Sequence, residues 1–167
     1  NSQEASIDKY ITGNMFAKRS GISEKTGNDT TWTDTLDIIY NNGAARMITK
    51  KGSGPELSSE GAVSFYYAGY IFNGSINASS LFTTNHKETA ASSGWTLTDE
   101  QDDILTISLN DYTLLPGLKS GLIGVRSGEE CQIFFSGKYG FGKKSSGIVP
   151  ANSALVYKIW VESISNE

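Results

Sequence analysis

The feature that most constrains this chain is a repeated two-residue alternation of large apolar side chains. It runs through Val63–Phe72, Glu129–Phe135 and Leu155–Val161, and a shorter run covers Ile104–Leu109. Successive side chains of a strand point to opposite faces, so each run presents one continuous apolar face to a core. In Val63–Phe72 the second face is aromatic as well. The chain is therefore predicted to fold around an antiparallel sheet that is covered on both faces.

The only strong helical pattern in the second half of the chain is short. Leu115, Leu118 and Leu122 recur at helical spacing, and Pro116 suits the first turn, which predicts one helix over residues 115–123. A helix this short can bury its leucines only by lying across the concave face of the sheet. The fold class is therefore predicted to be α+β, a half-wrapped antiparallel sheet around one short helix, with a pocket where helix and loops meet.

The first 44 residues are predicted to be an N-terminal extension before a main domain that spans residues 45–167. Apolar residues at helical spacing predict a helix within residues 1–20: Ile7, Tyr10, Ile11 and Met15. Residues 20–31 are polar and are predicted to be a linker. Asn41-Asn42-Gly43 between two apolar runs, Leu36–Tyr40 and Ala44–Thr49, predicts a hairpin.

Residues 75–103 are rich in Ser, Thr and Asn, and are predicted to be an inserted, irregular loop that borders the pocket mouth. Phe82 and Trp95 are its apolar points. An acidic cluster follows at Asp99–Asp103, but it lacks the glycine-centred spacing of a calcium loop, so no metal site is predicted. Thr98 and Gln101 fit a capping box for a short helical turn instead.

The residue types that usually carry chemistry are scarce. Cys131 is the one cysteine and lies in an alternating run, which predicts a buried strand residue. His86 is the one histidine and stands between polar neighbours, which predicts a solvent-facing loop. The net charge of -4 gives no electrostatic footprint for nucleic acid, and no apolar run reaches membrane-spanning length.

Eight segments carry recognisable motifs in a fixed order along about 120 residues: Lys51–Pro55, Val63–Tyr70, Asn73-Gly74, Leu81–Thr84, Leu114–Leu122, Ser127–Glu130, Lys138–Gly142 and Val149–Tyr157. In this order they resemble the motifs of the FK506-binding (FKBP) family of peptidyl-prolyl isomerases. The last segment, for example, resembles the family string IPANSTLVF. The resemblance covers the main domain and leaves the N-terminal extension and the length of the 75–103 segment without a counterpart.

The resemblance implies peptidyl-prolyl cis-trans isomerase activity on proline-containing polypeptides, in support of protein folding and without a cofactor or metal. The residues it implies for catalysis are Tyr67, Phe82, Leu115, Leu118, Phe141 and Tyr157. The residues it implies for substrate binding are Thr83, Leu105, Leu114 and Val149, although for Leu114 a role as a plain core residue is favoured. The backbone N–H of Leu115 would donate to the substrate carbonyl, and Leu118 would lie under the proline ring.

Three positions depart from the family pattern. Thr83 stands where the family has Asp, Leu118 where it has Trp, and Phe141 where it has Tyr, so the expected activity is low. A non-catalytic peptide-binding or chaperone module with the same fold is the alternative. A third hypothesis is a surface interaction domain that works through the 75–103 segment and Trp95.

A chain that starts at Asn1 rather than Met leads us to expect a processed protein of the bacterial cell envelope or periplasm. The sequence gives no indication of a client protein or of an oligomeric state.

Overall fold

The computed structural model describes residues 3, 5–11, 37–41, 43–74, 76–95, 97, 103–110, 115–144 and 149–166. Within these residues, one sheet has the strand order β1-β2-β6-β7-β3-β4, with β5 also paired to β3. Every pairing is antiparallel. The strands are β1 (Asp37–Asn41), β2 (Ala44–Lys50), β3 (Ala62–Ile71), β4 (Leu81–Thr84), β5 (Leu105–Ser108), β6 (Glu130–Phe135) and β7 (Leu155–Ser165).

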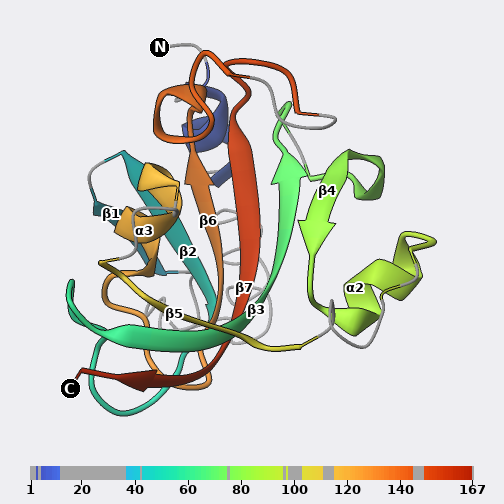
Figure 1. Ribbon diagram of the computed structural model, residues 1–167. Helices are drawn as coiled ribbons and strands as arrows, with labels where there is room; N and C mark the ends of the chain where they lie inside the picture. The colour runs from blue at the N-terminus through green and yellow to red at the C-terminus, as the bar shows by residue number, and fades with distance from the viewer. Residues whose placement is uncertain are drawn as a thin grey trace, which may run out of the picture.

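The concave face of the sheet wraps around helix α3 (Pro116–Leu122), as Figure 1 shows in front of β2 and β6. Leu118 and Leu122 are buried in the main core with residues of β3, β6 and β7. A Cβ on Gly117 would lie 2.2 Å from the Phe135 ring, and one on Gly121 would lie 2.2 Å from Ile133 Cγ2. Glycines at these positions therefore allow the helix to lie directly on the sheet. The predicted α+β fold with its central helix is confirmed.

The alternation in the sequence sorts the strand residues onto two faces. In β3, Val63 and Phe65 belong to the main core around α3, whereas Ala68 and Tyr70 belong to a second apolar cluster on the outer face. Both faces are thus covered, as the aromatic residues on both sides of this strand predict. The long pairing of β3 with β7 joins β4 and β5 to the β1-β2-β6-β7 part of the sheet.

Helical residues near the N-terminus cover part of the outer face. Ile7 and Ile11 are buried there, and the Tyr10 ring contacts Phe72 at 5.4 Å and Phe134 at 5.6 Å between centroids. The predicted N-terminal helix is confirmed over residues 5–11, while Met15 and the predicted linker lie outside the described residues. The predicted hairpin is confirmed as β1 and β2. Since β1 pairs into the same sheet, part of the predicted extension is joined to the main domain, and the boundary at residue 44 stays a prediction.

The expectation of an irregular loop over residues 75–103 is wrong for much of that segment. It contains the 3-10 turn η1 (Ala78–Ser80), strand β4 and the helix α2 (Lys87–Ser92). Polar composition hid these elements, because they are short and are stabilised by capping and pairing rather than by an apolar stripe. The capping-box turn predicted at Thr98 lies outside the described residues.

The solvent-facing loop predicted around His86 is also wrong. His86 is the N-cap of α2, where its Nδ1 accepts a hydrogen bond from the Thr89 N–H. Its ring stacks on Trp160 of β7, with centroids 3.7 Å apart and planes 8° apart. The neighbouring Asn85 is buried. Local polarity could not show this arrangement, because the stacking partner lies far along the sequence.

Candidate functional site

The candidate site lies on the concave face, where the start of α3 meets the sheet. It is built from aromatic residues on four separate segments: Tyr67 on β3, Phe82 on β4, Phe141 after the 3-10 turn η2 (Gly137–Tyr139), and Tyr157 on β7. The Phe82 ring centroid lies 5.9 Å from that of Tyr157 and 6.3 Å from that of Phe141, both edge-to-face. Tyr67 and Tyr157 are 6.3 Å apart. Such distances are typical of packed aromatic pairs.

The first turn of α3 adds aliphatic residues to this cluster. Leu118 and Val149 are buried in the same core, and Leu115 packs partly buried against it. Leu115 is the N-cap residue, and its carbonyl oxygen accepts from the Lys119 N–H at 3.0 Å. Among the described residues no hydrogen bond uses the Leu115 N–H. An amide at this helix end is available to an acceptor on a ligand, because the first N–H groups of a helix have no partner within it.

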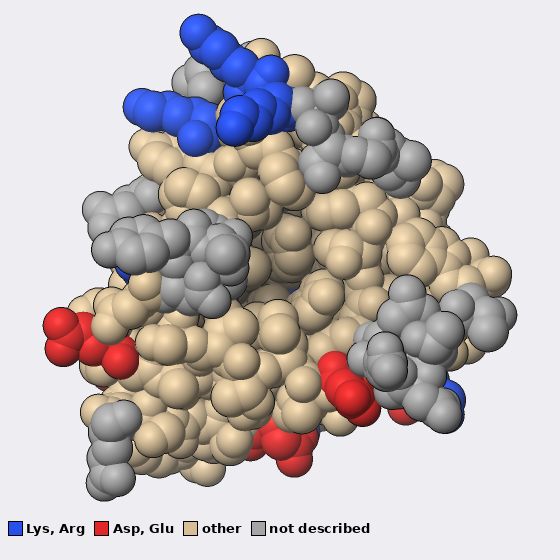
Figure 2. Space-filling model, in the orientation of Figure 1, with Lys and Arg blue, Asp and Glu red and all other residues tan. Residues whose placement is uncertain are grey.

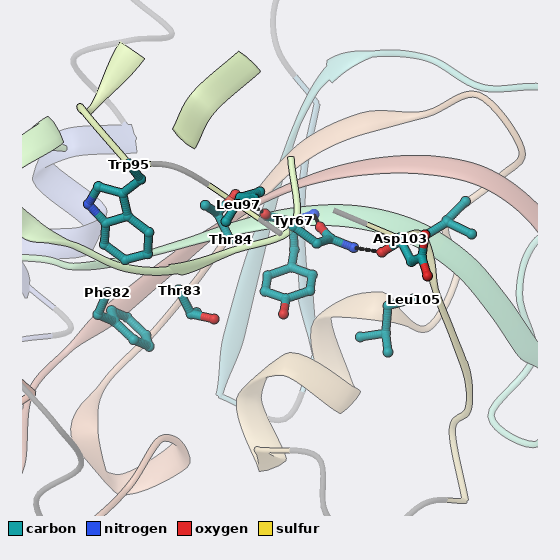
Figure 3. Close-up of a pocket in the computed structure, with 10 residues that line it drawn as sticks. Tyr67, Phe82, Thr83, Thr84, Trp95, Leu97, Asp103 and Leu105 are labelled. Atoms are coloured by element: carbon teal, nitrogen blue, oxygen red, sulfur yellow. Dashed lines mark hydrogen bonds between the residues drawn. The ribbon is translucent and has the colours of Figure 1, made fainter. Parts of the chain in front are cut away.

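A pocket of about 500 Å³ opens beside the aromatic cluster. Figure 3 shows Phe82 and Trp95 at one end, Leu105 and Asp103 at the other, and Tyr67 between them. Four predicted site residues line it: Tyr67, Phe82, Thr83 and Leu105. This volume falls within the range of small-ligand sites. The predicted site residues are thus brought to one region, with Leu114 outside the described residues, and their roles stay predictions.

Asn85 fixes the wall of this pocket and was not among the predicted site residues. Its Oδ1 accepts from the Tyr67 N–H at 2.6 Å, and its Nδ2 donates to the Asp103 carbonyl at 3.0 Å, the bond drawn in Figure 3. Nδ2 also approaches the Phe65 carbonyl at 3.4 Å. A buried amide with partners on two segments holds them in one arrangement. No sequence motif around Asn85 signals this role.

The hydroxyl of Tyr157 is a polar group that the sequence analysis treated only as part of an aromatic ring. Burial, and then the neighbouring Tyr67 phenol, raise the pKa of Tyr157. The phenol therefore stays protonated at neutral pH and keeps a hydrogen-bond donor. The signal was present, since Tyr157 occupies the last position of the segment that resembles IPANSTLVF.

Cys131 and the acidic residues add no further chemistry to this region. Cys131 is buried in β6 as predicted, and burial raises the pKa of its thiol well above the usual value, which makes it a poor nucleophile. In the part of the chain that the structure describes, no group of three or more His, Cys, Asp or Glu residues could hold a metal ion. Of the predicted acidic cluster only Asp103 is described. None of the described helices is long and apolar enough to cross a membrane.

The rim of the site carries positive charge at one end. Figure 2 shows basic side chains gathered at the end of this face where the η2 loop lies. The exposed lysines of that loop are Lys138, Lys143 and Lys144, close in sequence to Phe141. Acidic groups of a ligand near this end would be attracted over distances of about 8 Å at physiological salt.

Comparison with known proteins gives a consistent family. The profile of the family described as FKBP-type peptidyl-prolyl cis-trans isomerase matches residues 54–162. FK506-binding protein 1 from Aspergillus oryzae is 27% identical over 117 residues, which cover 70% of this chain and 94% of that protein.

Solved structures support the fold. A multi-domain immunophilin from Arabidopsis thaliana aligns with a TM-score of 0.61 and 18% identity, over 77% of this chain and 45% of that one. FkpA from Escherichia coli aligns with a TM-score of 0.55 and 17% identity, over 98% of this chain and 64% of that one. This chain thus spans less than half of the first structure and less than two thirds of the second.

Proposed function

This chain belongs to the FKBP-type peptidyl-prolyl cis-trans isomerase family, and we propose that its aromatic pocket catalyses rotation about X-Pro bonds of polypeptide substrates. The observation that carries the proposal is the convergence of Phe82, Phe141 and Tyr157 in one cluster with Leu115, whose N–H has no hydrogen bond to any described residue. The fold itself carries no argument here, since one fold serves many functions.

The chemistry needs no nucleophile. The barrier to rotation about a peptide bond is about 20 kcal/mol, because the planar amide is stabilised by resonance. A twisted amide has lost that resonance and much of its charge separation, so an apolar, water-poor pocket favours it relative to the planar form. The pocket then binds the transition state more tightly than the substrate, which is what acceleration requires.

Each pocket residue has a defined part in this proposal. Leu118 lies under the proline ring of the substrate, and the rings of Phe82 and Phe141 form the walls of the site around that ring. The Leu115 N–H and the Tyr157 hydroxyl are donors for substrate carbonyls. Four further residues contact the peptide around the proline: Tyr67, Thr83, Leu105 and Val149, with Leu114 proposed on the family resemblance alone.

The three departures from the family pattern lead us to propose a low rate. Thr83 and Phe141 remove two polar contacts, and a hydrogen bond to a substrate contributes about 0.5–1.5 kcal/mol. Because about 1.4 kcal/mol corresponds to a tenfold rate, the two losses lower the rate by roughly one to two orders of magnitude if both act in the transition state. Leu118 also offers a smaller floor than Trp.

The direct test is an exchange measurement on a short X-Pro peptide by NMR, which needs no coupled enzyme. We expect measurable acceleration by the wild type. The triple variant Leu118→Trp, Thr83→Asp, Phe141→Tyr should be faster, provided that the larger floor is accommodated. A wild type as fast as relatives with the full pocket would show that these three positions do not limit catalysis.

The departures also favour a second candidate function, a peptide-binding or chaperone module that has the same fold but does not accelerate isomerisation. Binding of the same peptide with no acceleration by either form would support this candidate and refute the isomerase proposal. The cell-envelope location stays a prediction, which fractionation of cells expressing the full reading frame would check.

A further inference from the structure

The pocket extends well beyond the residues that resemble the family motifs. Its volume of about 500 Å³ is more than a five-membered ring requires. Phe82 and Thr83 line one part. Beyond them the lining includes Trp95 and Leu97, from the 75–103 segment, whose length has no counterpart in the family motifs. We call the end lined by Phe82, Thr84, Trp95 and Leu97 the Trp95 compartment (Figure 3).

Trp95 is placed by the backbone at the end of α2. Gly94 has a φ of +78°, and its N–H donates to the Ala91 carbonyl at 3.2 Å. The Trp95 N–H donates to the Ala90 carbonyl at 2.8 Å. These two bonds form a Schellman motif, in which glycine adopts the left-handed conformation that ends a helix. The position of the Trp95 backbone is therefore set by the helix rather than by a free loop.

The start of α2 is fixed to the sheet as well. His86 caps the helix and stacks on Trp160, and Thr84 Oγ1 both donates to the Tyr67 carbonyl at 2.6 Å and accepts from the His86 N–H at 3.0 Å. Ala90 is the buried residue of α2. Both ends of α2 are thus held, so the compartment is formed before any ligand binds.

The Trp95 side chain is 38% exposed although it lines the pocket, so a ligand can cover more of it. Figure 3 shows its indole ring on the side of the pocket where Phe82 lies. Two aromatic residues beside the half-buried Leu97 suit an aromatic or large aliphatic side chain, because offset and edge-to-face aromatic contacts are favourable beyond the area they bury.

We propose that the Trp95 compartment binds a second side chain of the same substrate peptide, an aromatic or large aliphatic residue near the proline, and so determines substrate preference. The inference rests on the proposed function, since it takes the proline to occupy the neighbouring aromatic cluster. It assigns Trp95 a specificity role and not a catalytic one, because Trp95 lies beyond the residues proposed to surround the proline.

The test uses a peptide with alanines around one proline and a set in which the two residues on each side are changed singly to Phe. The wild type should favour Phe over Ala at one or more positions in kcat/KM. Trp95→Ala should reduce that preference, the ratio of kcat/KM for the Phe peptide to kcat/KM for the all-alanine peptide, two- to tenfold, the range given by one aromatic contact. Trp95→Phe should retain most of the preference. Tyr40→Ala, which removes an exposed aromatic residue on β1, is the matched control.

Equal effects of Trp95→Ala on all peptides, or an unchanged preference, would overturn the inference. If the wild type accelerates none of the peptides, the isomerase proposal fails, and dissociation constants from NMR titration of the same set decide the inference by themselves. A preference for Phe in binding that disappears in Trp95→Ala would then support the compartment. Binding without any preference would refute it.

Discussion

At the scale of single residues, the hydroxyl groups of the pocket determine which hydrogen-bond donors a substrate can meet there. Phe141 lacks the hydroxyl that the family usually has on its loop, whereas Tyr157 brings a buried one on β7. A phenol is protonated throughout the neutral range already at its ordinary pKa, and burial raises the pKa of Tyr157 further, so the hydroxyl can donate to a carbonyl. A donor is thus present in the same aromatic cluster, since the Phe82 ring neighbours both the Phe141 and the Tyr157 rings.

The corresponding prediction is that Tyr157→Phe lowers isomerase activity. Loss of one hydrogen bond to the substrate corresponds to about 0.5–1.5 kcal/mol, or roughly a two- to tenfold decrease in kcat/KM. The NMR exchange assay measures this rate directly. Tyr70→Phe is a matched control, because Tyr70 is a buried tyrosine of the outer face and should leave the rate unchanged. An unaltered rate in Tyr157→Phe would show that the hydroxyl does not contact the substrate.

At the scale of elements, a buried ion pair and a stacked histidine join segments of the chain. Arg46 on β2 pairs with Glu129, next to β6, and both side chains are 3% exposed. Glu129 also accepts from the Arg126 N–H at 3.2 Å. His86, in turn, joins α2 to β7 through its stack on Trp160. Both interactions join residues that are distant in sequence.

Removal of one partner of the buried ion pair should destabilise the protein strongly. Arg46→Met leaves the Glu129 carboxylate buried without its partner, which typically reduces the free energy of unfolding by about 3–5 kcal/mol. The double variant Arg46→Met, Glu129→Met should be considerably more stable than the single one, because no uncompensated charge remains. Urea unfolding followed by circular dichroism measures both. A double variant as unstable as the single variant would assign the loss to packing instead.

The helix cap predicts a pH dependence. Burial lowers the pKa of His86, with opposing smaller effects of Glu88 and Glu130, and Nδ1 accepts from the Thr89 N–H only when it is unprotonated. The unfolded chain therefore binds the proton more readily than the folded one. The contribution of the cap is fully present above the ordinary pKa of 6.5 and is lost as the pH falls through the lower folded value.

Hydrogen exchange of the α2 amides should accordingly quicken below about pH 6.5, after correction for the intrinsic rates. His86→Asn, which keeps a capping side chain without a titrating ring, should show no such acceleration. The nearby charged groups are Lys50, Lys87, Glu88, Glu130 and Glu162, which line a shared surface pocket with His86. If His86→Asn behaves like the wild type, one of these groups is responsible and not the cap.

At the scale of the whole molecule, the N-terminal residues complete the fold on the side away from the pocket. Ile7, Tyr10 and Ile11 cover aromatic residues of β6 and of the end of β3. Gln3 reaches the η2 loop as well, where its Oε1 accepts from the Gly137 N–H at 2.8 Å. The same loop carries Phe141, so the N-terminal residues contact both the outer core and the segment that borders the site.

We predict that Ile11→Ala lowers the free energy of unfolding by about 2–5 kcal/mol, as expected for truncation of a fully buried aliphatic side chain. Ile39→Ala is the matched control, because Ile39 is 41% exposed on the edge strand β1 and should change stability little. Chemical unfolding of both variants gives the comparison. A loss below about 1 kcal/mol for Ile11→Ala would mean that the N-terminal helix separates from the sheet before the core unfolds.

The sequence by itself determined the helix α3 and the strands of the sheet other than β4. Strict alternation in Val63–Phe72 requires one covered face, and the leucine spacing at residues 115–122 requires a helix against it, so local periodicity carries this information. The aromatic members of the candidate site were named from the family resemblance instead, because each lies in a segment with a recognisable motif.

Only the tertiary structure decided the features that depend on partners distant in sequence. The stack of His86 on Trp160, the bonds of Asn85 across β3 and residue 103, and the burial of Arg46 beside Glu129 each join segments separated along the chain. Polar side chains look alike in a sequence whether they face water or a buried partner. Their role depends on what packs against them, which is why Trp95 and its compartment became visible only in the folded molecule.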